Sequence, residues 1–289
     1  MPVSTVDVSV LICTRNRADK LRHALTSLTA LRVPPGVTWE VIVVDNGSSD
    51  ATPEVIGAFS GRLPLRSVAE LGRGVSRAKN TGIRTANGRY FLLTDDDCRV
   101  APDWLATGHR LLDGGPVQII GGRVELFDPA DLPVAVRTTP DLGVLTDFSQ
   151  LIGFMHGANL ALPRALLDRV GLFDERLGPG TRVGAAEDAD LMYRAFSAGI
   201  PIVYEPDLLV HHDHGRRGRD AWYAQVGMYA IGAGGMALKY LLRGDARACK
   251  MAYWDFKSTM RLFRHDRREW RRVVAKLRMI NGTVRYCLG

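Results

Sequence analysis

Short runs of apolar residues alternate with helix-like patterns through the first half of the chain. This alternation is the sequence feature that most restricts the possible folds. The first run covers residues 8–12 and is followed by Leu21, Leu25 and Leu28, which would share one face of a helix. A second run covers residues 40–44. Because these runs contain few polar residues, they indicate strands buried on both faces, as in a parallel sheet covered by helices. The sequence therefore predicts an α/β fold.

Three consecutive carboxylates, Asp95, Asp96 and Asp97, end another apolar run at residues 90–94. Like charges this close repel one another, and a hard divalent cation bound by carboxylate oxygens relieves that repulsion. Open α/β sheets bind their ligands outside the carboxyl ends of the strands. The cluster therefore predicts phosphate chemistry with a divalent cation, although a hydrated acidic turn is the alternative for such a charge run taken alone.

Polar side chains also follow the first two apolar runs. Thr14, Arg15 and Arg17 come after the first run and offer a hydroxyl and two guanidiniums to a diphosphate. Asp45 ends the second run, where its carboxylate would bind a ribose or a base, or would cap the turn that begins at Asn46. Three polar strand ends at one edge of a sheet are more informative than each alone, and together they favour nucleotide binding.

Two further clusters carry titratable side chains. Glu187 and Asp188 begin a predicted helix over residues 187–197, where the helix dipole stabilises negative charge. They would act either as helix-stabilising acids or, for an ionised Asp188, as a general base. Three histidines follow an apolar run at 208–210 and suit contact with a metal or a phosphate, namely His211, His212 and His214.

The balance of charge divides the chain near residue 215. The chain has 289 residues with a formal net charge of +7, and residues 215–289 hold 17 basic against 5 acidic side chains. The preceding part therefore carries more acidic than basic residues. The pattern after residue 215 predicts helices, with breaks at four glycines: Gly227, Gly232, Gly234 and Gly235.

The cysteines and the hydropathy of the chain indicate the cellular compartment in which the protein is expected. The four cysteines show no paired spacing, so neither a zinc site nor a disulfide framework is indicated, and a reducing cytoplasm is expected. The first ten residues lack a basic segment followed by a long apolar stretch, and no run of about 18 apolar residues occurs. We therefore expect neither a secretory signal nor a membrane-spanning helix.

Five motifs in this order resemble the family 2 glycosyltransferases with a GT-A fold: residues 8–17, 40–48, 77–80, 95–97 and 187–188. The resemblance covers residues 8–214, and the runs at 155–161 and 171–175 look like the acceptor-side half of that family. It implies a Rossmann-like, mostly parallel sheet flanked by helices. It also implies a catalytic domain over 1–214, with a nucleotide-sugar half (1–115) and an acceptor half (116–214), and a helical, basic extension over 215–289.

The resemblance also implies roles for the motif residues. Contacts to the nucleotide sugar would come from Thr14, Arg15, Arg17, Asp45, Arg77, Asn80, Asp95 and Asp96. Asp97 would ligate Mg²⁺ or Mn²⁺ with His212 nearby, and Asp188 would be the catalytic base, with Glu187 as the next candidate. The implied reaction is an inverting transfer of a sugar from a nucleoside diphosphate to an acceptor hydroxyl, in polysaccharide or glycoconjugate biosynthesis.

Two positions depart from that family's pattern, and two other functions compete with it. Asn46 stands where many relatives have a second Asp, and the acceptor loop is replaced by residues 178–182, which contain Gly and Arg. A nucleotidyltransferase acting on a sugar phosphate would need a glycine-rich loop after the first strand, which residues 13–16 lack. A non-catalytic nucleic-acid-binding protein would explain the basic tail but not the aspartates, so we expect no nucleic-acid partner.

The tail after residue 215 interleaves aromatic side chains such as Trp222, Tyr229 and Trp254 with the basic ones. This mixture predicts either a peripheral helix set on an anionic membrane or a helical lid or homo-oligomer contact. The first alternative would bring the chain to the inner face of the membrane and to a lipid-linked or cell-envelope acceptor.

Overall fold

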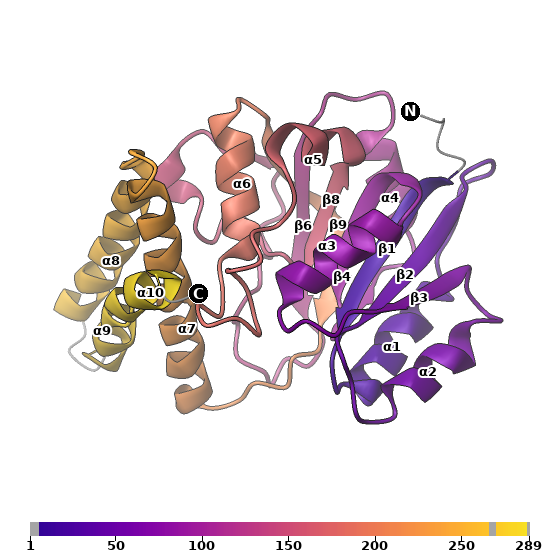
Figure 1. The fold of residues 1–289 in the computed structure, drawn as a ribbon, viewed down its shortest axis with the longest axis horizontal. Helices are drawn as coiled ribbons and strands as arrows, with labels where there is room; N and C mark the ends of the chain where they lie inside the picture. The colour runs from indigo at the N-terminus through magenta and orange to yellow at the C-terminus, as the bar shows by residue number, and fades with distance from the viewer. Residues whose placement is uncertain (1–5, 266–269, 288–289) are drawn as a thin grey trace.

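A computed structural model describes residues 6–265 and 270–287 of the chain. Its centre is one nine-stranded sheet in the order β3-β2-β1-β4-β8-β6-β9-β5, with β7 also paired to β9 (Figure 1). The strands are β1 (Val6–Thr14), β2 (Trp39–Asp45), β3 (Leu65–Ala69), β4 (Gly88–Asp95), β5 (Cys98–Val100), β6 (Ile119–Leu126), β7 (Gly143–Val144), β8 (Asn159–Pro163) and β9 (Ile202–His212).

The first half of the sheet is parallel and sets the predicted polar edge. Strands β3, β2, β1 and β4 all run in one direction. The pairing places Thr14 opposite Asp45 and Cys13 opposite Asp95, so the carboxyl ends of β1, β2 and β4 lie side by side. The predicted α/β sheet and the meeting of its strand ends are therefore confirmed.

The second half of the sheet is mixed, whereas the sequence pattern indicates a mostly parallel sheet. Strand β8 lies antiparallel between β4 and β6, and β5 and β7 pair antiparallel with β9. All five residues of β8 are buried. A strand covered on both faces loses the alternation of polar and apolar residues that marks most antiparallel strands, so its direction does not show in the sequence.

Helices cover both faces of the sheet and form two apolar cores with it. One face carries α1 (Ala18–Leu28), α2 (Thr52–Phe59) and α4 (Trp104–Leu112). The other carries α3 (Val75–Thr85), α5 (Arg164–Val170) and α6 (Glu187–Ser197). A short 3₁₀ turn, η1 (Phe148–Gln150), lies before β8 in the chain and contributes Phe148 to the second core.

The basic extension forms four helices beside α6: α7 (Arg219–Leu241), α8 (Arg247–His265), α9 (Trp270–Leu277) and α10 (Met279–Cys287) (Figure 1). Met236 and Tyr240 of α7 and Met251 of α8 are buried in the same core as α6. The extension thus shares its core with the sheet. Among the described helices, none combines the length and the hydropathy needed to cross a membrane.

Helix α7 is continuous, so the predicted breaks at Gly227, Gly232, Gly234 and Gly235 are wrong. Its glycines serve packing instead. A Cβ added at Gly232 would lie 2.8 Å from the Cβ of Ala185, and one added at Gly235 would lie 2.8 Å from Cγ1 of Val183. Burial against neighbouring backbone outweighs the low helix propensity of glycine here.

A buried ion cluster fixes α7 to α6. Lys239 of α7 forms ion pairs with Asp190 of α6 and with Asp174, whose Oδ2 lies 2.9 Å from the Lys239 Nζ. The Tyr240 hydroxyl donates to Oδ1 of Asp190 at 2.8 Å, and Asp190 has no exposed surface. A buried carboxylate needs such partners, because desolvation makes an unpaired charge costly.

Candidate active site

A cavity of about 570 Å³ lies at the carboxyl ends of β1 and β4, between that edge of the sheet, α6 and α7. Its polar lining comes from several elements: Thr14, Arg15 and Arg17 after β1, Asn46 after β2, Lys79 on α3, Asp95–Asp97 at the end of β4, Glu187 and Asp188 on α6, and His212 on β9. Nine of the twelve residues that the sequence assigned to catalysis, the nucleotide sugar or the metal therefore line one cavity.

The aspartate cluster ends β4, and Asp96 and Asp97 form the turn into β5. The Thr14 hydroxyl donates to Oδ2 of Asp96 at 2.7 Å. The Arg17 guanidinium lies across both carboxylates, 2.8 Å from Oδ1 of Asp96 and 2.7 Å from Oδ2 of Asp97. Arg17 thus balances part of the charge that the three strand-end aspartates bring together.

Burial and neighbouring cations act differently on the two carboxyls of the turn. Burial raises the pKa of Asp96 to about 7, against the opposing charge of Arg17. Burial also acts to raise the pKa of Asp97, but hydrogen bonds and charge from His212 and Arg17 outweigh it and hold that pKa below its ordinary value. Asp97 is therefore the carboxylate of the turn that stays ionised at neutral pH, as a metal ligand must be.

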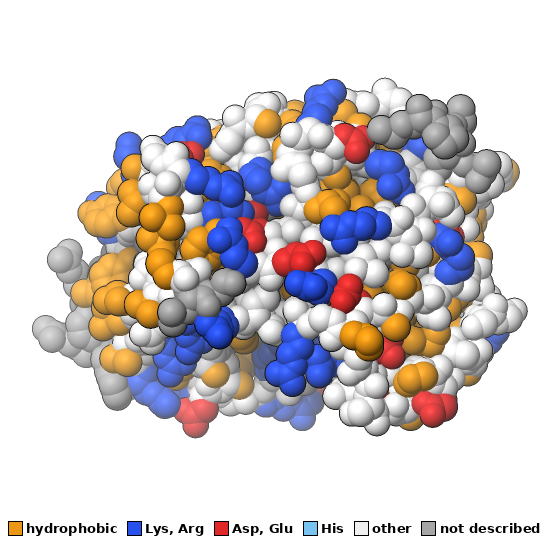
Figure 2. Space-filling view, viewed as in Figure 1, with side chains coloured by type: hydrophobic (Ala, Val, Ile, Leu, Met, Phe, Trp, Pro, Cys, Tyr) orange, Lys and Arg blue, Asp and Glu red, His pale blue; other side chains and the backbone are white. Residues whose placement is uncertain are grey.

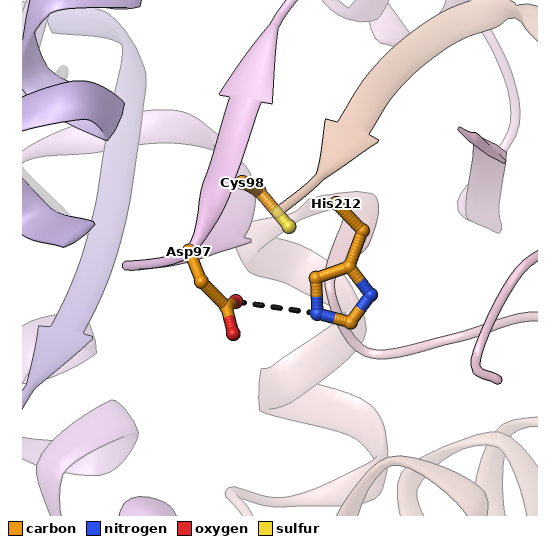
Figure 3. A group of neighbouring side chains, drawn as sticks. All are labelled: Asp97, Cys98 and His212. Atoms are coloured by element: carbon orange, nitrogen blue, oxygen red, sulfur yellow. Dashed lines mark ion pairs between the residues drawn. The ribbon is translucent and has the colours of Figure 1, made fainter. Parts of the chain in front are cut away.

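His212 reaches Asp97 through the pairing of β5 with β9, which aligns Cys98 with His212. The Nε2 of His212 lies 3.3 Å from Oδ1 of Asp97, and both side chains point into the same space (Figure 3). His211 instead lies near Glu125 on the other side of β9. The sequence left the choice among three histidines open, and strand register makes His212 the one that meets the aspartates.

The side chains around this pair fit a hard divalent cation. Asp97, Cys98 and His212 bring potential ligand atoms within 4.8 Å of one another. Burial raises the pKa of the Cys98 thiol well above its usual value, so the sulfur stays protonated and is a poor ligand. The buried Nδ1 of His212 has no hydrogen-bond partner among the described residues. An oxygen from Asp97 and a nitrogen from His212 remain as the donors that suit Mg²⁺ or Mn²⁺.

Asp188 lies in the first turn of α6 and is held by backbone donors. The N–H of Gly157 donates to its Oδ2 at 2.9 Å, and the N–H of Ala189 donates to its Oδ1 at 2.7 Å. These two hydrogen bonds hold the Asp188 side chain in place in the cavity lining.

Glu187 is buried and is engaged by Lys79. The Lys79 Nζ donates to Oε1 of Glu187 at 3.0 Å, and both side chains are nearly inaccessible to solvent. Burial lowers the pKa of Lys79, but the negative charges of Glu187 and Asp95 outweigh it, so the pKa is raised and the ammonium stays protonated. Burial raises the pKa of Glu187, with the Lys79 charge acting against it. Among the described residues, Glu187 forms an ion pair with a lysine, whereas Asp188 does not.

Arg77 and Asn80, two predicted nucleotide-sugar contacts, lie outside the residues that line the cavity. The guanidinium of Arg77 is 3.1 Å from Oε2 of Glu175. The buried amide of Asn80 exchanges two hydrogen bonds of 3.0 Å with the backbone of Phe173. In this structure Asn80 therefore joins α3 to the segment before α6, and its polar atoms are fully occupied there.

Two polar residues follow one another at the end of β2, and only the second, Asn46, lines the cavity. Oδ1 of Asp45 accepts from the N–H of Ser48 at 2.8 Å, which is the turn-capping alternative left open by the sequence. Asp45 is absent from the cavity lining, whereas Asn46 is part of it. The Asn46 amide donates to the carbonyls of Glu70 and Gly72, so it fixes the loop that follows β3.

Sequence reasoning missed Lys79 as a site residue. Lys79 lies four residues after Val75, and both line the cavity together with Ala78. A lysine on the same helical face as apolar residues is the signal that would have revealed it, because a buried ammonium requires a carboxylate partner.

Comparisons with known proteins agree with this geometry. Residues 9–170 match the family model described as glycosyl transferase family 2. The chain is 30% identical over 245 residues to a pre-mycofactocin glycosyltransferase of Mycobacterium tuberculosis, covering 81% of this chain and 48% of that protein. It is 29% identical over 210 residues to glycosyltransferase AglE of Haloferax volcanii, covering 71% and 66%. The chain thus spans about half to two thirds of the length of these relatives.

Solved structures show the same architecture. The mannosyltransferase PcManGT of Pyrobaculum calidifontis, in complex with GDP-Man and Mn²⁺, aligns with a TM-score of 0.66 at 21% identity, over 99% of this chain and 89% of that one. TarS of S. aureus aligns with a TM-score of 0.59 at 17% identity, over 82% and 71%. The fold is the GT-A fold of glycosyltransferases. The chain belongs to glycosyltransferase family 2.

Proposed function

We propose that this chain is an inverting glycosyltransferase that moves a sugar from a nucleoside diphosphate to an acceptor hydroxyl. One observation carries the proposal. A single cavity holds the Asp95–Asp97 cluster at the strand edge and Asp188 on α6, whose carboxylate accepts a backbone hydrogen bond. This arrangement suits a reaction in which a diphosphate leaves near the aspartate cluster and a proton is removed by Asp188.

The donor side of the proposal rests on the strand edge. Asp97 and His212 would hold Mg²⁺ or Mn²⁺, and the guanidiniums of Arg15 and Arg17 face the same space. When bound, the cation would stabilise the charge that develops on the departing diphosphate. Two structural relatives support a donor of this class, since PcManGT was solved with GDP-Man and Mn²⁺ and TarS with UDP-GlcNAc.

The acceptor side rests on Asp188. Its carboxylate would remove the proton of the acceptor hydroxyl as the hydroxyl oxygen attacks the anomeric carbon from the face opposite the diphosphate. Glu187, the neighbouring carboxylate, is buried and paired with Lys79, so it is poorly placed to form a covalent sugar intermediate. A single displacement follows, and a single displacement inverts the anomeric configuration.

The outer surface of the extension supports a peripheral membrane role in addition. Tyr253, Trp254, Leu277 and Ile280 are exposed on α8–α10. In Figure 2, apolar side chains gather with Lys and Arg at the end of the molecule formed by these helices. An anionic bilayer would satisfy both kinds of side chain and would bring a lipid-linked or cell-envelope acceptor to the enzyme at the inner face of the membrane. A homo-oligomer contact through the same helices is the competing proposal.

A donor screen tests the proposed function. The protein is heated with UDP-, GDP- and dTDP-sugars in Mn²⁺ or in EDTA, because a ligand that binds only the native state raises the apparent melting temperature. The donor that stabilises the protein is then turned over, and proton NMR of the released or transferred sugar reports its anomeric configuration. We expect one nucleotide class to stabilise the chain only with the cation, and an inverted product. A retained configuration would contradict the single displacement.

A further inference from the structure

The cavity also has an apolar compartment, whose lining differs in chemistry from the charged strand edge. This compartment is walled by Ile152 before β8, Met192 on α6, and Met228, Tyr229 and Met236 on α7. Five of the eight methionines of the chain line the cavity as a whole. Methionine side chains are flexible and polarisable, so they adapt to apolar ligands of varied shape.

Two α7 residues give this compartment an accessible surface. Met228 and Tyr229 keep 37% and 39% of their surface exposed, although both line the cavity. Burial and the negative charge of Asp188 raise the pKa of the Tyr229 phenol to about 12, so the hydroxyl stays protonated, with Gln225 as its hydrogen-bond partner. Tyr229 thus stands near the proposed base with a neutral ring and one polar atom.

The wall is fixed to the catalytic body. Gly232 allows α7 to approach Ala185, just before α6, and the buried Lys239 pairs with Asp190 on α6 itself. These contacts hold α7 against α6, the helix that carries Asp188.

The geometry points to an acceptor that carries an apolar group, either an aliphatic chain or an aromatic ring, next to the hydroxyl that receives the sugar. This inference rests on the proposed function. The donor diphosphate belongs at the charged edge near Asp97, and the attacking hydroxyl must reach Asp188. The remainder of the acceptor must then extend away from the donor. The cavity lining near Asp188 includes Met228, Tyr229 and Met236 of α7, a helix that contacts residues 184–186. A fully hydroxylated acceptor would leave Met228 and Met236 without a matching apolar partner.

Binding of simple glycosides tests the inference without any donor. Calorimetric titration of the full chain compares methyl, phenyl and n-octyl β-D-glucosides below the concentration at which micelles form. Each buried methylene contributes about fourfold in affinity, so we expect octyl glucoside to bind at least about tenfold more tightly than methyl glucoside. The phenyl and octyl arms separate an aromatic group from an aliphatic chain.

Two substitutions on α7 provide the control. Met228→Gln should remove most of the gain from the octyl group, because it places an amide in the apolar wall. Leu241→Gln should keep the gain, since Leu241 is 53% exposed on the same helix and lies outside the cavity lining. Equal affinities for methyl and octyl glucosides, or equal losses in the two variants, would overturn the inference. Because no donor is present, a chain that binds octyl glucoside but transfers no sugar would contradict the proposed function alone.

Discussion

The two walls of the cavity are built by different means. The sheet wall gathers charge, and parallel strand register places the end of β4 beside β1, as in the pairing of Cys13 with Asp95. The α7 wall is mostly apolar, and it is fixed by glycine contacts and by the buried Lys239. Because the two walls depend on different interactions, substitutions in the apolar wall should leave the charged side chains of the sheet wall in place. We expect donor chemistry and acceptor choice to be separable by mutation.

The largest expected effect is the loss of turnover when Asp188, the proposed base, is replaced. Asp188→Asn keeps the shape of the side chain but cannot accept a proton, so turnover should fall by about 10²- to 10⁴-fold while donor affinity changes little. Steady-state kinetics together with donor titration measure both quantities. Retention of more than about a tenth of the activity would make Asp188 a helix-stabilising acid, and Glu187→Gln would then be the variant to compare.

The attachment of the α7 wall is tested by Lys239→Met. Removing the ammonium leaves the fully buried Asp190 with fewer partners, and breaking a buried ion pair costs about 3 kcal/mol or more. Urea unfolding followed by circular dichroism should show a lower midpoint than for Lys250→Met, an exposed lysine of α8. Equal midpoints would mean that the helices of the extension are held by apolar packing alone.

The charge of the sheet wall is tested by Asp97→Ala. Losing this carboxylate should remove the effect of Mn²⁺ on nucleoside diphosphate affinity, a loss of about 10- to 100-fold, comparable to losses measured for groups that support a metal site. Calorimetric titration in Mn²⁺ and in EDTA provides the measurement. Asp103→Asn serves as the control, because Asp103 is exposed and forms an ion pair with Arg32 at the surface. Equal wild-type affinity in Mn²⁺ and EDTA would exclude the cation.

The smallest expected effect concerns the outer face of the extension. The protein should float with anionic liposomes at low salt and less so at high salt, since each Lys or Arg near such a surface contributes on the order of 1 kcal/mol. Replacing Trp254, which is 45% exposed, by Ser should weaken flotation without altering donor binding. Protein that never floats, but elutes as a larger species in gel filtration, would assign this face to an oligomer contact.

The contrast between the two walls also explains which parts of the site could be predicted from the sequence. Asp95, Asp97 and Thr14 follow apolar runs directly, and the strand ends of a parallel sheet meet at one edge, so their proximity was accessible from spacing. Lys79 was not, because its role depends on the partner that α6 presents to it, more than 100 residues later in the chain. At Gly232 the sequence predicted a helix break that the structure does not have. A glycine lowers helix propensity locally, and only the contact with Ala185 shows why the helix continues.

The position of β8 has a consequence for the order in which the chain is made. Strand β4 pairs with β1 on one side and with β8 on the other, although β8 begins at Asn159, more than 60 residues after β4 ends. A ribosome that has released only the first 115 residues therefore presents β4 with one unpaired edge, and its apolar residues 91–93 lie along that edge. An open strand edge invites pairing with other chains. Pairing with β8 therefore covers this edge of β4 only once the second half of the chain has been made.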